Sequence, residues 1–68
     1  MTRKDYVAAA AAIKGTTDRA GNLGLTIPEV YAYVRGARAV ALELAYHFAS
    51  DNPRFDTARF LKACGVQS

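Results

Sequence analysis

The fold depends on the segment LTIPEVYAYVRGARAVALELAYHFAS, residues 25–50. Thr26 and Glu29 have the spacing of a capping box, in which each side chain satisfies a backbone N–H of the other residue. Pro28 falls in the first turn, where its missing N–H does no harm. Apolar residues then recur at steps of three and four until the sequence Asp-Asn-Pro at 51–53. We therefore predict a long helix over about residues 27–50.

This helix is apolar around much of its circumference. One stripe, which we expect to face the core, consists of Ile27, Val30, Val34, Ala37, Ala41, Leu44 and Phe48. A second stripe, which we expect to stay partly exposed, consists of Tyr31, Leu42, Ala45, Tyr46 and Ala49. Such a helix is either central in its fold or carries an intermolecular surface. A straight helix of about 36 Å would exceed a compact domain of this size, about 28 Å across. We therefore expect either a bend, for which Gly36 is the candidate, or one end that projects and packs elsewhere.

The residues before this segment predict a first helix over about residues 3–14. Thr2 is a suitable N-cap with Asp5 at the N3 position, and Gly15 is the residue type that commonly follows a helix end. The next residues, GTTDRAGNLGL at 15–25, are rich in Gly, Thr, Asp and Asn. We therefore expect a long loop there, of the kind that is often functional or mobile.

A third helix is predicted over about residues 57–64. Asp56 is placed as its N-cap, and Phe55 and Phe60 have the spacing of a hydrophobic staple. Gly65 and Val66 are suited to a Schellman ending. The chain, residues 1–68, is thus predicted to be one all-α domain, with two short helices packed on the long one.

Composition and charge narrow the classes of function. The chain has 68 residues, of which fourteen are alanine, so the core is expected to be thin. One Cys and one His exclude an internal disulfide and a zinc site built from N and S ligands of one chain. No apolar stretch approaches the ~20 residues of a membrane span, and Asp5 interrupts what would be the basic start of a secretion signal. We expect a cytoplasmic protein, without a metal or cofactor.

His47 and Cys64 are the sole candidates for a nucleophile–base pair. Cys64 lies at the C-terminus of a predicted helix, where the helix dipole opposes a thiolate. We interpret Cys64 as a small buried residue and His47 as a partly exposed side chain near Glu43. No catalytic residues are predicted, and we do not expect an enzyme.

Arginines on the long helix indicate a binding surface. Arg35 and Arg38 are three residues apart, and neither has an acidic residue four positions away. Because Tyr and Arg dominate binding hot spots, we predict a partner-binding surface of Tyr31, Arg35, Arg38, Leu42 and Tyr46. A solvated basic face is the alternative interpretation. A secondary basic patch is predicted at Arg54, Arg59 and Lys62.

Both ends of the chain carry recognisable motifs. RKDY at 3–6 precedes an alanine-rich helix, and DNPRFD at 51–56 is followed by ARFL at 58–61 and ACGV at 63–66. These segments resemble a family of small uncharacterised bacteriophage and prophage proteins, while residues 16–50 depart from that pattern. The resemblance implies a helical fold and a phage context, and it supplies no catalytic residues.

Two classes of function remain open. The first is a small phage-type protein that binds a host or phage protein, for example as an inhibitor of a host defence system such as an anti-CRISPR protein. The same surface would also suit a homodimer. The alternative is a small basic nucleic-acid-binding protein, which the net charge of +3 permits. The expected eleven-residue connection is longer than the turn of about 3–4 residues in a helix-turn-helix, which favours protein binding.

Overall fold

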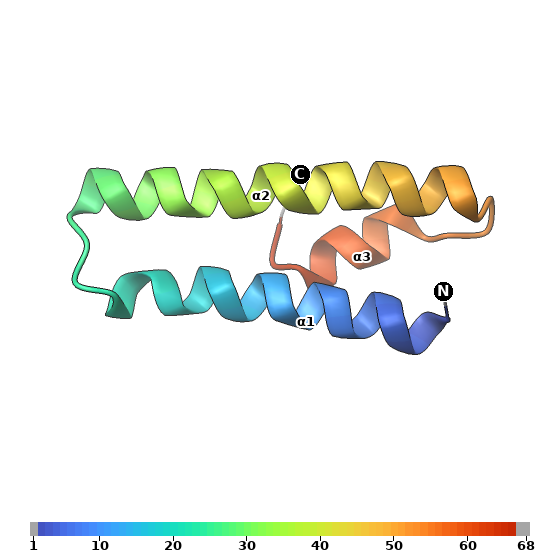
Figure 1. Cartoon of the computed structure of the whole chain (residues 1–68), viewed down its shortest axis with the longest axis horizontal. Coiled ribbons are helices and arrows are strands. Elements are labelled where there is room, and N and C mark those ends of the chain that lie inside the picture. Colours follow the sequence, from blue (N-terminus) through green and yellow to red (C-terminus); the bar gives the residue numbers. More distant parts are fainter. Residues whose placement is uncertain (1, 67–68) are drawn as a thin grey trace.

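Three α-helices and one short 3-10 helix make up the computed structural model, which describes residues 2–66. Helix α1 spans Arg3–Arg19 and continues into the 3-10 helix η1, Ala20–Asn22, while α2 spans Ile27–Asp51 and α3 spans Thr57–Ala63. Helices α1 and α2 lie antiparallel, side by side, and α3 packs against the half that contains the start of α1 and the end of α2 (Figure 1). The predicted all-α arrangement, with two shorter helices on a long one, is confirmed.

Capping boxes fix the starts of α1 and α2 as the sequence predicts. The N–H of Thr26 donates to Glu29 Oε1 at 2.8 Å, and the N–H of Glu29 donates to Thr26 Oγ1 at 3.3 Å. At α1 the N–H of Thr2 donates to Asp5 Oδ2 at 3.0 Å. The carboxylates of Asp5 and Glu29 accept hydrogen bonds from the backbone N–H groups of Thr2 and Thr26. These bonds stabilise the ionised form and so lower the pKa of both carboxyl groups.

Both ends of α3 also follow the sequence signals. Asp56 Oδ1 accepts the N–H of Arg59 at 3.0 Å, as an N-cap does. Gly65 has a φ of +80°, and the N–H of Val66 donates to the carbonyl of Leu61 at 2.9 Å. This is the predicted Schellman ending, and α3 ends one residue earlier than expected.

The first helix is longer than predicted. It continues through Gly15 to Arg19 and into η1, so the expected end at residue 14 and the expected loop over 15–25 are wrong. The connection between η1 and α2 is confined to residues 23–26. Its left-handed residue is Gly24, with a φ of +72°, whereas Gly15 has no positive φ.

Local interactions and packing accompany the turns of α1 beyond Gly15. Lys14 Nζ pairs with Asp18 Oδ2 at 2.7 Å, four residues ahead on the same face. The hydroxyls of Thr16 and Thr17 donate to backbone carbonyls one turn earlier, at 2.9 and 3.1 Å, rather than capping a new element. Ala20 is buried at the start of η1, so the added turns also contribute packing.

Helix α2 runs through Gly36 without interruption, and Figure 1 shows no bend there. Of the two alternatives, the bend at this residue is therefore wrong. The molecule is elongated, 40 × 18 × 15 Å, rather than compact. A straight helix of 25 residues, about 38 Å long, fits within the long dimension.

Replacing Gly36 by alanine should stabilise the protein by about 0.5–1 kcal/mol, because alanine loses less backbone entropy in a helix. Apart from the adjacent backbone of α2 itself, the added Cβ would have no heavy atom within 4 Å. Thermal unfolding followed by circular dichroism should then show a higher Tm. Gly65→Ala is the matched control and should lower the Tm, because its φ of +80° strains any residue with a Cβ. A Gly36→Ala variant with an unchanged or lower Tm would contradict this expectation.

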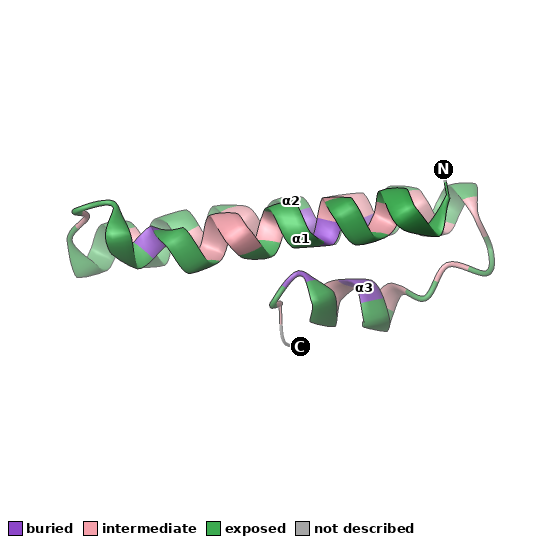
Figure 2. Ribbon diagram, turned by 90° about the horizontal axis from the view of Figure 1, so that it is seen from below, coloured by how far each residue is buried: buried purple, intermediate pink, exposed green. Residues whose placement is uncertain are grey.

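The buried core is thin and lies along the line where the helices meet (Figure 2). Among residues 2–66 its buried members are Ala10, Ala20, Ala41, Ala45, Phe60 and Cys64. Half-buried aromatic rings extend this core: Phe60 contacts Phe48 and Phe55, and Tyr6 contacts the same two rings, with centroids 4.7–5.5 Å apart. The predicted staple between Phe55 and Phe60 is part of this cluster.

Large apolar side chains remain exposed outside this core. Within the described residues they are Val7, Leu23, Ile27, Tyr31, Tyr33, Val40, Leu42 and Tyr46. Despite these residues, no helix in the described part of the chain is both long enough and apolar enough to cross a membrane.

Candidate partner-binding surface

The residues predicted to bind a partner lie on one face of α2. Tyr31, Arg35, Arg38, Leu42 and Tyr46 follow one another at steps of four, three, four and four. At 3.6 residues per turn they fall within an arc of about 80° and span about 22 Å of the helix. All five are exposed. We call this set the α2 surface.

Exposure of the apolar members is large. Tyr31 is 67% exposed, Leu42 45% and Tyr46 68%, as the sequence predicts for the second stripe. The ring of Tyr46 packs edge-on against the ring of His47, with centroids 5.6 Å apart, so one of its sides is supported. The α2 surface therefore presents two tyrosine rings and a leucine to solvent.

Ile27 and Ala45 exchange places relative to the prediction. The sequence assigns Ile27 to the core stripe and Ala45 to the exposed one, but Ile27 is 75% exposed and Ala45 is buried. They are 18 residues apart, or about five full turns, so they face the same direction. Helix α3 packs against the C-terminal half of α2 and leaves the N-terminal half uncovered (Figures 1 and 2). Ile27 thus extends the α2 surface by one turn. Ile27 was not predicted from the sequence as part of this surface.

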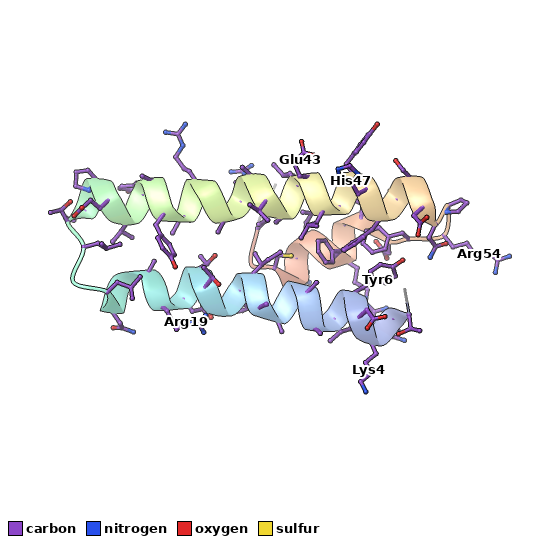
Figure 3. The ribbon with its side chains drawn as sticks, viewed as in Figure 1. Lys4, Tyr6, Arg19, Glu43, His47 and Arg54 are labelled. Atoms are coloured by element: carbon purple, nitrogen blue, oxygen red, sulfur yellow. The ribbon has the colours of Figure 1, made fainter. Side chains whose placement is uncertain are left out.

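Arg35 and Arg38 carry charge that the fold does not use. Within residues 2–66, Lys14 forms an ion pair with Asp18, and His47 Nε2 lies 3.5 Å from Glu43 Oε2. Glu43 and His47 project from α2 on the side turned away from α1 (Figure 3). The α2 surface is therefore basic between its apolar residues.

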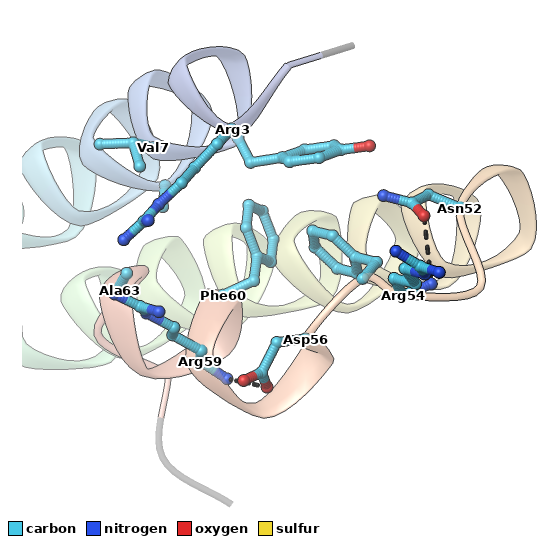
Figure 4. Close-up of a pocket in the computed structure, with 11 residues that line it drawn as sticks. Arg3, Val7, Asn52, Arg54, Asp56, Arg59, Phe60 and Ala63 are labelled. Carbon is cyan, nitrogen blue, oxygen red and sulfur yellow. Dashed lines mark hydrogen bonds between the residues drawn. The ribbon is translucent and has the colours of Figure 1, made fainter.

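The secondary basic patch is only partly brought together. Arg54 and Arg59 line a groove of about 360 Å³ between the start of α1 and α3, and Lys62 does not (Figure 4). The third arginine at this groove is Arg3, which sequence reasoning did not place there. No local signal could have indicated it, because the groove forms only where α1 and α3 lie together.

Cys64 and His47 do not form a nucleophile–base pair. Cys64 is fully buried, and this burial raises the pKa of its thiol, whereas His47 is exposed on α2. The interpretation of Cys64 as a small buried residue is confirmed. Residues 2–66 contain no group of three or more His, Cys, Asp or Glu side chains that could hold a metal ion.

No protein-family profile, curated protein or solved structure matches this chain. The resemblance of its two ends to phage proteins therefore stays a prediction.

Proposed function

We propose that this protein acts by binding another protein through the α2 surface. The observation that carries the proposal is the pair Arg35 and Arg38, without ion-pair partners in the described residues, between exposed Tyr31 and Leu42. Contiguous apolar surface on a small protein marks interaction sites, and Tyr and Arg supply most of the binding energy at such sites. Two guanidinium groups at the centre favour a partner surface that carries carboxylates.

The α2 surface is free because the fold is held together elsewhere. Buried contacts of α2 come from Ala41 and Ala45, with Phe48 in the aromatic cluster. The α2 surface contributes no residue to this core. Its large side chains can therefore change without loss of the fold, which is the condition for a surface that serves a partner.

A phage context is part of the same proposal. It is supported by the terminal motifs at 3–6 and 51–66, which resemble phage and prophage proteins. Small helical proteins that inhibit host defence systems, anti-CRISPR proteins among them, act by docking on a host protein, and we propose this mode by analogy. The partner would then be a host protein with an acidic surface.

Nucleic-acid binding is the competing function, and the fold favours it less. Helices α1 and α2 are antiparallel neighbours (Figure 1), whereas the helices of a helix-turn-helix cross at about 90–120°. The candidate recognition helix α3 has seven residues. Binding to DNA would be steeply salt-dependent, so a mobility shift at low salt tests this function directly.

The double variant Arg35→Glu/Leu42→Asp should lose partner binding while it keeps the fold. Both residues are exposed, so circular dichroism and the Tm should change little. Each hot-spot residue contributes about 2 kcal/mol or more, so the affinity should fall at least about thirtyfold. A pull-down from host lysate identifies the bound protein, and titration calorimetry with that purified protein measures the loss. Size-exclusion chromatography of the wild type and of this double variant tests self-association through the same surface.

Lys4→Glu/Val40→Asp is the matched control. It makes the same change of charge at exposed residues outside the α2 surface, and Lys4 projects from the outer side of α1 (Figure 3). The control should bind like the wild-type protein. Equal affinity and equal oligomeric state for wild type and Arg35→Glu/Leu42→Asp would refute the proposal.

A further inference from the structure

The groove between α1 and α3 combines an apolar floor with a basic rim. Its floor is formed by Tyr6, Val7, Ala10, Phe55, Phe60 and Ala63. Its rim carries Arg3 from α1, Arg59 from α3 and Arg54 from the connection before α3. A volume of about 360 Å³ lies within the range of ligand sites, about 300–1,000 Å³.

Charge at the groove is positive and not neutralised by the fold. No ion pair within residues 2–66 involves Arg3, Arg54 or Arg59. The single acidic residue of the lining, Asp56, uses Oδ1 to accept the backbone N–H of Arg59 at 3.0 Å. Three guanidinium groups therefore face the groove with one carboxylate between them, which favours an anionic ligand.

The basic groups are distributed along the groove rather than gathered at one point. Arg3 and Arg59 extend toward one end, and Arg54 lies at the other end beside Asn52 (Figure 4). The N–H of Arg54 donates to Asn52 Oδ1 at 3.1 Å, which holds this part of the connection in place. A ligand that uses all three arginines must carry negative charge at both ends and an apolar group between them.

The aromatic floor favours an aliphatic side chain over a nucleobase. Tyr6 packs on Phe48 and Phe55 at 4.8 and 4.7 Å, and Phe55 packs on Phe60 at 5.5 Å. Because these rings are already packed against one another, they do not form the open stacking platform that single-stranded nucleic acids need. An apolar side chain can rest on their edges without displacing them.

We propose that this groove binds a short acidic peptide segment of a protein partner. An aliphatic side chain of the segment rests on the floor of Phe55 and Phe60. Flanking carboxylates meet Arg54 at one end and Arg3 with Arg59 at the other, where the guanidinium forks match carboxylate geometry. None of these residues belongs to the α2 surface, so this site stands whether or not that surface binds.

A titration followed by ¹⁵N–¹H NMR on the full chain tests the proposal. The probe is the blocked peptide acetyl-Glu-Asp-Leu-Leu-Asp-Glu-amide, and the comparison peptide has Gln and Asn in place of Glu and Asp. We expect saturable shifts at the amides of Val7, Arg59 and Ala63 with the acidic peptide. The uncharged peptide, inorganic phosphate and a single-stranded oligonucleotide should bind at least about tenfold more weakly.

Two double variants test whether peptide binding depends on the arginines of the rim. The double variant Arg3→Glu/Arg59→Glu should weaken binding of the acidic peptide at least about tenfold. Both changes place an acidic residue in the first turn of a helix, where a negative charge is tolerated. Lys4→Glu/Lys62→Glu makes the same charge change on the same helices outside the groove and should bind like the wild type. The proposal is overturned by absence of saturable shifts, by equal binding of the uncharged peptide, or by tighter binding of phosphate or oligonucleotide at the same amides.

Discussion

Replacement of Phe60 by alanine should remove most of the stability of this protein. Phe60 is 5% exposed and is the one aromatic ring among the buried residues of the described chain. It contacts Phe48 and Phe55, with ring centroids 5.4 and 5.5 Å away, so it joins α2, α3 and the connection between them. Truncation of a buried Phe to Ala costs about 3–5 kcal/mol. The whole unfolding free energy expected at this length is about 3–10 kcal/mol.

Urea unfolding followed by circular dichroism measures this loss. Phe60→Ala should either unfold at much lower urea than the wild type or show no folded baseline. Phe60→Leu keeps most of the apolar volume, so it should stay folded with a smaller loss. Tyr31→Ala removes an equally large side chain that is 67% exposed, and it should change the unfolding free energy by less than about 0.5 kcal/mol. Equal midpoints for Phe60→Ala and the wild type would show that the aromatic cluster does not hold the fold.

Features that depend on neighbouring residues were predictable from the sequence. The start of α2 at Thr26 and Glu29, and the N-cap Asp56 of α3, are set by side chains within three residues of the backbone groups they bind. The Schellman ending at Gly65 is equally local. The all-α class followed from these signals because each of them specifies where a helix begins or ends.

Other features depend on contacts that no local pattern contains. Gly15 has the form of a helix stop, but the chain continues as helix to Arg19 and into η1, where Ala20 is buried. The compact-domain estimate suggested a bend at Gly36, yet the molecule is 40 Å long, with α1 beside α2, and α2 stays straight. In both cases the missing information was the length over which two helices lie together.

The candidate sites also contain features that the sequence predicts and features that depend on the fold. Exposure of Tyr31, Leu42 and Tyr46 follows from helical periodicity, and the structure confirms it. Exposure of Ile27 and burial of Ala45 follow from the short reach of α3, which periodicity cannot give because the two residues face the same direction. The groove needs α1 and α3 to lie together, so the place of Arg3 within it emerges only from the fold.

Alanines set how closely the helices of this protein approach. Ala10 on α1 and Ala41 and Ala45 on α2 are buried, together with Cys64. They belong to one cluster, which also contains Phe60. A methyl group at these positions lets helix backbones come close, so the thin core gains tight packing where it lacks bulk. The richness in alanine therefore supports the fold as well as limiting it.

Ala41→Leu should destabilise the protein by about 1–3 kcal/mol, because extra carbon atoms in a packed core force the surrounding elements apart. Ala41 has no exposed surface, so a leucine there cannot turn to solvent without moving α1 or α3. Urea unfolding measures the loss, and Ala39→Leu, at an exposed position of the same helix, should stay within about 0.5 kcal/mol of the wild type. Both variants add the same atoms to α2, so a difference between them reports packing alone. If the two variants proved equally stable, close contact at Ala41 would not be what holds the three helices together.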